Sequence, residues 1–384
     1  MKVTGWSVNA LDDTQSSAPV LPLQLLSGRA SVSRRVRKLG RGGFPGTGVS
    51  GCCQFVTSGH RRSVRSALAT TVPVVPRAGR EYPRTLDEFN NWFRSDEDCR
   101  AFLERLRWPD GFRCSCGGGK AWRVRRNRLR CSECERETSV IAGTLFEGAR
   151  LPLTSWFQAA WFMTNQKLGS SALGLQRALG LSRYDTVWTI LHKYRRAMVR
   201  PDREPLAGVV EVDESYVGGA SRGSTGRGSL GKTIVAIAVE ARPEGACGRA
   251  RLARIADCSA PVLTDFVGER CEPLTEIHTD GWAGYLWLGD AGFIHVPTTA
   301  MTSPDPAHVL MPRVHRVSAL LKRWLLGTHQ GGVSERQLDF YLDEFVFRFN
   351  RRGSGSRGLL FYRLLEQAVR VDPTPGFAIV RGRS

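Results

Sequence analysis

Four cysteines gather in one short stretch of the chain and could bind a single metal ion. They are Cys114, Cys116, Cys131 and Cys134, and six other cysteines are scattered through the 384 residues. The second pair, C-S-E-C, has the spacing of a zinc knuckle, in which both thiolates reach one tetrahedral ion. The first pair, C-S-C, is one residue shorter, so glycines 117–119 would have to adapt the turn. Two interpretations stay open, a structural Zn²⁺ site and four reduced thiols without metal.

Two aspartates lie in strand-like segments and could act on phosphate esters. Asp213 lies within V-V-E-V-D-E-S-Y-V, and Asp280 ends T-E-I-H-T-D before a glycine turn. Each has an ordinary alternative, an edge acid that reaches solvent for the first and an Asp-Gly turn for the second. On adjacent strands, however, the two carboxylates could share Mg²⁺ or Mn²⁺ ions, which assist both the attacking and the leaving oxygen in phosphodiester cleavage.

A third ligand is expected from a downstream helix. In P-R-V-H-R-V-S-A-L-L-K-R-W, His315 and Lys322 are seven residues apart and therefore lie on one helix face, two turns from each other. Imidazole is acceptable to Mn²⁺ and poor for Mg²⁺. The alternatives for His315 are a phosphate contact and a core position. Lys322 is expected to contact a DNA phosphate.

Other basic residues would have to be presented by helices and by the loop between the cysteine pairs. Two short amphipathic helices flank Gly180, with Ser182 as the expected N-cap of the second. This layout is typical of a helix-turn-helix, and also of a plain helical hairpin. The expected DNA contacts are Arg183, Tyr184, Lys193, Arg195 and Arg196 on the second helix, with Arg123, Arg125, Arg126, Arg128 and Arg130 between the cysteine pairs.

The two aspartates need a sheet, and the pattern after Pro201 predicts one. Strands are expected at 209–217, 233–240, 249–255 and 275–280, followed by helices at 314–326 and 338–350. Strands followed by helices that pack on them indicate a mixed α/β layer. Upstream of the cysteines, two amphipathic helices are expected, and Asp96 is the predicted cap of the second.

Residues 1–80 are rich in Gly, Ser, Pro and Arg and are predicted to be disordered. They hold 12 Lys and Arg against two acids, so +10 of the net charge of +19 lies there and +9 lies on the other 304 residues. This segment is either a DNA-binding arm or upstream sequence translated from a misplaced start.

The overall excess of positive charge favours a polyanionic partner such as nucleic acid. No apolar run approaches the roughly 18–20 residues of a spanning helix, which argues against a membrane protein. A secretory signal is not apparent, and the cysteine content is far below that of a disulfide scaffold. We therefore expect a cytoplasmic protein associated with the nucleoid.

Several motifs, taken together and in order, resemble those of bacterial insertion-sequence transposases over about residues 81–370. They include Y-P-R-T-L-D-E-F, W-P-D-G-F-R-C, V-D-E-S-Y-V-G-G, H-T-D-G-W-A-G-Y and H-R-V-S-A-L-L-K-R-W. The resemblance implies a zinc ribbon, a helix-turn-helix and an RNase-H-like DDE-type catalytic domain. It matches Asp213 and Asp280 to the catalytic aspartates, His315 to the variable third position and Lys322 to the lysine seven residues later.

The same resemblance implies metal-dependent cleavage and joining of double-stranded DNA at terminal inverted repeats, by a homo-multimer on DNA. The expected fold is α/β, an RNase-H-like mixed sheet with flanking helices. The alternatives are a non-catalytic DNA-binding protein derived from a decayed transposase, and a general RNase-H-type nuclease. The expected layout is a basic extension (1–80), N-terminal helices (81–110), a zinc ribbon (111–150), a helix-turn-helix region (151–202), a catalytic domain (207–370) and a tail (371–384).

Overall fold

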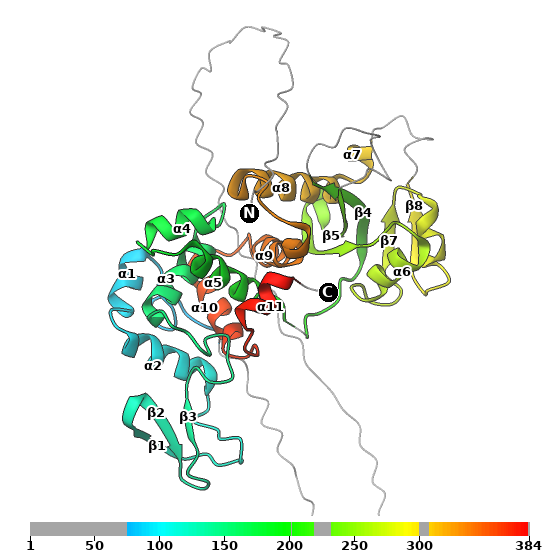
Figure 1. The fold of residues 1–384 in the computed structure, drawn as a ribbon. Coiled ribbons are helices and arrows are strands. Elements are labelled where there is room, and N and C mark those ends of the chain that lie inside the picture. The colour runs from blue at the N-terminus through cyan, green and yellow to red at the C-terminus, as the bar shows by residue number, and fades with distance from the viewer. Residues whose placement is uncertain (1–74, 201, 219–231, 299–306, 383–384) are drawn as a thin grey trace, which may run out of the picture. The chain divides into compact units, whose positions relative to one another are not determined.

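The computed structural model describes residues 75–200, 202–218, 232–298 and 307–382, and Figure 1 shows their elements. The predicted disordered extension, residues 1–80, falls outside the described residues as far as position 74. Within the described part, no helix is both long enough and apolar enough to cross a membrane.

The helices of the N-terminal half begin at well-defined caps. The N-cap of α2 is Ser95, which forms a capping box with Asp98. Asp96, the predicted cap, is instead the first residue of α2, and its carboxylate accepts the backbone N–H of Thr154 at 3.2 Å. The helices of this half are α1 (Leu86–Trp92), α2 (Asp96–Arg107), α3 (Leu153–Asn165), α4 (Ala172–Ala178) and α5 (Tyr184–Ala197).

A helix from the far end of the sequence, α10 (Arg357–Ala368), completes the core of these N-terminal helices. The ring of Phe361 lies between 5.5 and 5.9 Å, centroid to centroid, from the rings of Phe89, Phe93, Phe157 and Trp161. The segment expected to form the catalytic domain ran to residue 370, yet the buried side chains of α10 belong to this helical core.

A small three-stranded sheet follows α2. Its antiparallel strands are β1 (Ala121–Val124), β2 (Arg128–Cys131) and β3 (Glu137–Ser139), in the order β1-β2-β3. The two residues at the β1–β2 turn, Arg126 and Asn127, have φ of 58° and 53°. The hairpin between the two cysteine pairs is therefore present, as expected for a zinc ribbon.

The larger sheet has five strands in the order β6-β5-β4-β7-β8. β4 pairs antiparallel with β5 and parallel with β7, so the sheet is mixed and β4 is central. This confirms the α/β class and the RNase-H-like mixed sheet predicted from the sequence. The strands are β4 (Val209–Val217), β5 (Thr233–Ala241), β6 (Cys247–Ile255), β7 (Glu276–Thr279) and β8 (Ile294–Pro297).

Helices cover both faces of this sheet (Figure 1). Val210 and Val212 of β4 join the core under α6 and η3, whereas Ser215 bonds to α8 on the other face. This alternation follows from the two-residue period of a strand. The covering helices are α6 (Ala260–Gly268) and η3 (Ala283–Leu288) on one face and α8 (Pro312–His329) and α9 (Leu338–Asn350) on the other.

Short elements complete the described part. They are η1 (Arg125–Asn127), η2 (Pro243–Gly245), α7 (Ala307–Leu310), η4 (Glu335–Gln337) and α11 (Gly376–Arg381).

Candidate functional site

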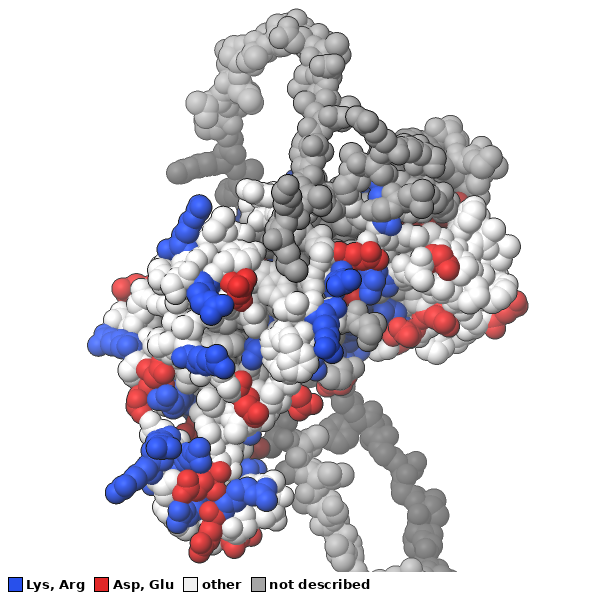
Figure 2. All heavy atoms as spheres, viewed as in Figure 1, with Lys and Arg blue, Asp and Glu red and all other residues white. Residues whose placement is uncertain are grey.

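The arginines of the ribbon hairpin, expected to face DNA, are partly paired with acids. Figure 2 shows Lys and Arg side chains mixed with Asp and Glu side chains over this ribbon. Arg123 lies 2.9 Å from Glu104 of α2, and Arg130 lies 2.6 Å from Glu137. Arg128 lies 3.8 Å from Glu137 as well. These pairs are surface pairs, which hold a side chain only weakly.

The tip of the same hairpin carries its most available positive charge. Arg125 and Arg126 are exposed there, within η1. The hairpin tip is therefore the part of the ribbon best suited to a phosphate contact.

The second helix of the predicted helix-turn-helix, α5, begins at Tyr184. Its N-cap is Arg183, and not Ser182, and this cap makes no side-chain hydrogen bond. Arg183 and Tyr184 are exposed at this end of the helix. In a helix-turn-helix the N-terminal residues of the second helix contact base edges, so these positions suit that role.

Arg195 of α5 is buried, which does not fit the DNA contact predicted for it. Its side chain is 2% exposed, and its Nε donates to Glu344 Oε2 of α9 at 2.8 Å. Its guanidinium lies 4.0 Å from the ring centroid of Tyr341. The charge of Arg195 therefore joins α5 to α9 and is not presented to a partner.

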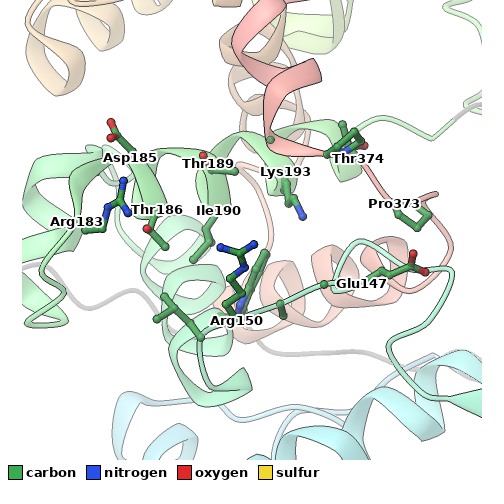
Figure 3. Close-up of a pocket in the computed structure, with 16 residues that line it drawn as sticks. Glu147, Arg150, Arg183, Asp185, Thr186, Thr189, Ile190, Lys193, Pro373 and Thr374 are labelled. Atoms are coloured by element: carbon green, nitrogen blue, oxygen red, sulfur yellow. The ribbon is translucent and has the colours of Figure 1, made fainter.

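A hollow of about 620 Å³ lies beside α5 (Figure 3). Lys193 of α5 lines it, with Nζ 5.6 Å from the ring centroid of Trp156. Partial burial lowers the pKa of Lys193, and the charge of Glu147 acts in the opposite direction. Arg150, from the loop before α3, points toward α5 in this hollow. The basic residues that line the hollow are thus accompanied by the acid Glu147.

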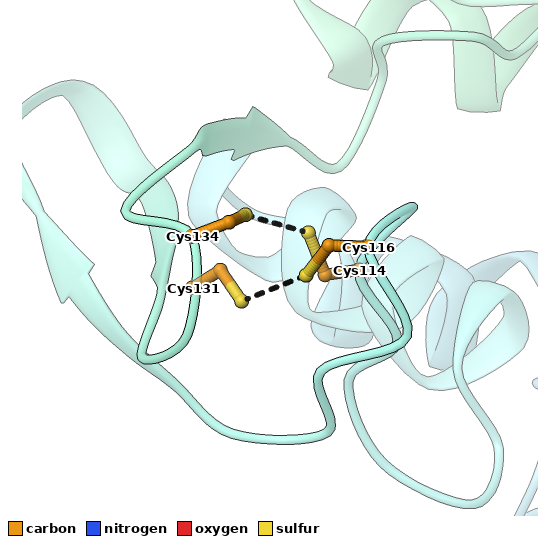
Figure 4. A group of neighbouring side chains, drawn as sticks. All are labelled: Cys114, Cys116, Cys131 and Cys134. Carbon is orange, nitrogen blue, oxygen red and sulfur yellow. Dashed lines mark hydrogen bonds between the residues drawn. The ribbon is translucent and has the colours of Figure 1, made fainter.

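The four cysteines come together, as expected (Figure 4). Their sulfur atoms all lie within 4.8 Å of one another, and the Cys114–Cys134 and Cys116–Cys131 pairs are each 3.6 Å apart. Four sulfurs at about 2.3 Å from a tetrahedral Zn²⁺ lie roughly 3.8 Å apart, so the cluster fits this ion. Among the described residues, this is the group of three or more His, Cys, Asp or Glu side chains close enough to hold a metal ion.

Glycines allow the short C-S-C turn to present both sulfurs. Gly117 has φ of 98°, and its N–H donates to the carbonyl of Cys114 at 3.0 Å. The N–H of Gly118 points at the sulfur of Cys116 at 3.4 Å. The backbone N–H of Cys116 is the main cause that lowers the pKa of Cys114 to about 6. The missing residue therefore does not prevent the four sulfurs from gathering.

Asp213 lies on β4, and Asp280 directly follows β7, the strand that pairs parallel with β4. In the register of β4 and β7, Glu211 is opposite His278, so Asp213 and Asp280 each come two residues after the last paired position. Both aspartates are half-buried. The two carboxylates thus come beyond the same end of the stretch in which these adjacent strands pair, and their joint role stays a prediction.

Hydrogen bonds with nearby backbone N–H groups orient both carboxylates. Asp213 Oδ1 accepts from Glu214 at 2.8 Å, and Asp280 Oδ1 accepts from Trp282 at 2.9 Å. Burial raises the pKa of the Tyr285 hydroxyl, and the charges of Glu214, Asp213 and Asp280 raise it further. All three carboxylates therefore lie near enough to this buried hydroxyl for their charges to act on it.

Helix α8 lies over the same part of β4. Ser215 Oγ and Ser318 Oγ are 2.7 Å apart. This bond attaches α8 to β4 two residues beyond Asp213. On the other side of Asp213, buried Glu211 accepts the N–H groups of Arg313 and Val314 at 2.7 and 2.9 Å. Asp213 therefore faces the stretch of α8 between these two attachments.

His315 lies between the two attachments of α8, and Lys322 lies one turn beyond Ser318. Partial desolvation and Lys232 lower the pKa of Lys322, whereas the charge of Asp213 acts to raise it. His315 is half-buried. The structure brings His315 and Lys322 to the side of the sheet that Asp213 faces, but it does not gather Asp213, Asp280 and His315 into a compact metal-holding group.

Sequence reasoning missed the residues that support this site. Glu211, Ser215 and Ser318 join the strand to the helix, and Glu214 adds a carboxylate whose charge acts on Tyr285. The signal that could have found Glu211 and Ser215 is their two-residue spacing from Asp213, which puts all three on one face of the strand. Ser318 could have been found in a similar way, because it is three residues after His315 and therefore lies on the same face of that helix.

Two segments of the chain match known domains. Residues 205–350 match the ISXO2-like transposase domain, and residues 94–137 match the transposase zinc-ribbon domain. A protein in transposable element ISH50 of Halobacterium salinarum is 26% identical over 288 residues, which covers 67% of this chain and 91% of that relative. The matched segments contain the cysteine cluster, the five-stranded sheet and α8. The chain therefore carries a zinc ribbon and a DDE transposase domain of the IS1595 type.

Proposed function

We propose that this protein cleaves and joins DNA strands at the terminal inverted repeats of an insertion sequence. The observation that carries the proposal is that Asp213 and Asp280 each follow the paired stretch of two adjacent parallel strands, β4 and β7, and that α8 is bonded to β4 beside Asp213. In this proposal the two aspartates and His315 hold the catalytic metal, and Lys322 contacts the DNA backbone. The DDE domain of the family implies a divalent metal and a DNA substrate.

The donor chemistry at the site agrees with this role. Carboxylate oxygens suit Mg²⁺ and Mn²⁺, and an imidazole shifts the preference toward Mn²⁺. Such ions, when bound, help an oxygen to attack phosphorus and stabilise the oxygen that leaves. The backbone N–H groups of Glu214 and Trp282 hold the two carboxylates in place for this purpose.

The proposed reaction has two steps. In the first, a water oxygen bonds to phosphorus, the bond from phosphorus to the 3′-oxygen breaks, and the element end keeps a 3′-hydroxyl. In the second, this 3′-hydroxyl attacks a target phosphodiester, and the target's own 3′-oxygen leaves. Each attacking oxygen loses a proton and each leaving oxygen gains one, so both steps balance.

The proposed DNA contacts are basic residues that are exposed or only partly buried. They are Arg125 and Arg126 at the ribbon tip, Arg183 and Lys193 on α5, and Lys322 on α8. Arg123 and Arg128 would exchange their weak surface pairs for phosphates. Two element ends must be brought together in transposition, so we propose a homo-multimer on double-stranded DNA.

We also propose that the four cysteines hold a structural Zn²⁺. Four sulfur ligands close the coordination shell, so this ion would stabilise the ribbon and take no part in catalysis. The S···S distances of 3.6 Å support the proposal. Metal analysis of the purified protein should find about one zinc per chain, and a content well below that contradicts the proposal.

A strand-transfer assay on DNA that carries the terminal repeats tests the catalytic proposal. The wild type should cleave and join in Mg²⁺ or Mn²⁺, and Asp213→Asn should lose at least about 100-fold, because removing one catalytic group typically costs that much. Asp290→Asn, at an exposed acid beyond η3, is the matched control and should keep wild-type activity.

The outcomes separate the three readings of the chain. If wild type and Asp213→Asn behave alike, the catalytic reading is wrong. Binding to the repeats without cleavage indicates a non-catalytic DNA-binding protein. Cleavage that ignores the repeat sequence indicates a general nuclease.

A further inference from the structure

We propose that Trp282 is a stacking platform for an unpaired nucleobase beside the phosphodiester that the site cleaves. This inference rests on the proposed function, because it needs DNA in the site of Asp213 and Asp280. It adds a base-binding position to a site otherwise built from groups that act on phosphate.

The backbone of Trp282 is tied to the candidate catalytic acid. Its N–H donates to Asp280 Oδ1 at 2.9 Å. The indole Nε1 donates to the carbonyl of Cys258, the residue just before α6, at 3.1 Å. Both polar groups of this residue are therefore used within the protein, and the orientation of the ring is fixed at two points.

The ring itself remains partly open to solvent. Trp282 is 38% exposed, although tryptophan is a costly residue to leave in water. A partly exposed tryptophan held two residues from a candidate catalytic acid is suited to a flat, apolar ligand. Every nucleobase offers such a face, whatever the sequence.

A glycine makes this pose possible. A Cβ at Gly284 would lie 2.4 Å from the carbonyl oxygen of Cys258 and 2.9 Å from Cδ1 of the Trp282 ring. Only a residue without a side chain lets that carbonyl and the indole approach each other so closely. The position of the ring is thus built into the loop after β7.

The proposed reaction would bring a nucleobase close to Trp282. In this proposal, a strand whose phosphodiester enters the half-buried pair of carboxylates has its flanking base unstacked from the duplex, where an aromatic ring can stack on it. The base flanking the cleaved bond would then need a partner close to Asp280. Trp282 is the aromatic residue hydrogen-bonded to that acid.

The chain provides a matched control on η3, the 3₁₀ helix of which Trp282 is the N-cap. Trp287 is 51% exposed and lies five residues further along, without a bond to Asp280 among the hydrogen bonds of the described residues. If any exposed tryptophan in η3 served equally well, as it would in a protein-docking patch, Trp282 and Trp287 would behave alike.

The test couples the tryptophan to a single base of the DNA. Full-length protein is assayed for repeat binding and for cleavage on normal DNA and on DNA with one abasic site at each position flanking the cut. Trp282→Ala should weaken both by about ten-fold, since stacking is worth roughly 1–3 kcal/mol per base. Trp282→Phe, which keeps a stacking face, should retain most of the function, and Trp287→Ala should match the wild type.

At one flanking position, the loss caused by the abasic site and the loss caused by Trp282→Ala should not add. The abasic site should cost the wild type about as much as Trp282→Ala does, and it should cost that variant nothing more. Losses that add at every position overturn the proposal, as does an equal effect of Trp287→Ala. The DNA-binding measurement does not depend on cleavage. It therefore still tests stacking if the cleavage assay shows the proposed catalysis to be wrong. Near-wild-type function of Trp282→Phe also rules out a general loss of folding.

Discussion

Gly118 is the residue on which the geometry of the cysteine cluster depends most directly. A Cβ at this position would lie 2.8 Å from the sulfur of Cys131 and 3.0 Å from the carboxylate of Glu133. Gly118→Ala should therefore displace one ligand and lower the affinity for zinc by about ten-fold or more, within the range for a disturbed ligand shell.

The adjacent Gly119 is a matched control for this prediction. A Cβ at Gly119 would meet nothing within 4 Å. Competition with a coloured chelator should therefore show unchanged zinc affinity for Gly119→Ala and weakened affinity for Gly118→Ala. Equal affinities for the two variants would show that the sulfurs do not form one tight shell.

Arg195 shows at residue scale what a sequence pattern leaves open. Its position on an amphipathic helix with other basic residues indicated a DNA contact, because charged side chains are mostly exposed. Its partner, Glu344, is 149 residues away in the sequence, so no local pattern could reveal the pair. Arg125 and Arg126, at a hairpin tip, had no such distant partner in the described structure and are exposed as expected.

At the scale of elements, one buried acid holds α3, α5 and α9 together. Glu344 of α9 accepts from Arg195 of α5 at 2.8 Å and from Arg348 at 3.4 Å. Arg348 in turn donates to the carbonyl oxygens of Met163, at the end of α3, and of Gln166 just beyond it. The acid is fully buried, so its removal leaves two cations facing each other without compensation.

This arrangement predicts an asymmetry between the two partners. Glu344→Gln should lower the free energy of unfolding by about 3–5 kcal/mol, as expected for a broken buried pair. Arg195→Met should cost less, because Glu344 keeps Arg348 as a partner. Chemical denaturation measures both, with the more exposed pair of Arg363 and Glu366 as a control worth about 1 kcal/mol or less. A larger loss for Arg195→Met would contradict this account.

Regular elements with a clear period could be predicted from the sequence. Segments 209–217 and 338–350 were predicted as a strand and a helix, and they coincide with β4 and α9. β8, with four residues, and the docking of α10 against Phe89 were not predicted, since both depend on contacts distant in sequence. The same holds for the site. The acids were visible as residue types, and the spacing of Glu211 from Asp213 puts both on one strand face, but the bonds from Glu211 to α8 depend on a contact about 100 residues away in the sequence.

At the scale of the whole molecule, two buried histidines link the stability of the fold to pH. His192 on α5 and His329 at the end of α8 both lie against the ring of Tyr341 on α9. Burial, followed by the charge of Arg195, lowers the pKa of His192 to about 2 and that of His329 to about 3. Both histidines therefore stay neutral in the folded protein at pH values where they are protonated in the unfolded chain.

The sign of the pH dependence follows from this difference. The unfolded histidines bind protons below pH 6.5 and the folded ones do not, so acid favours unfolding. Each histidine contributes about 1.4 kcal/mol per pH unit, so between pH 6 and pH 4 the free energy of unfolding should fall by about 2.7 kcal/mol per unit. His329→Phe keeps the aromatic contacts with Trp324 and Tyr341 and should halve that slope in urea denaturation series. An unchanged slope in this variant would mean that His329 titrates alike in both states, and that α8 does not bury it against α9.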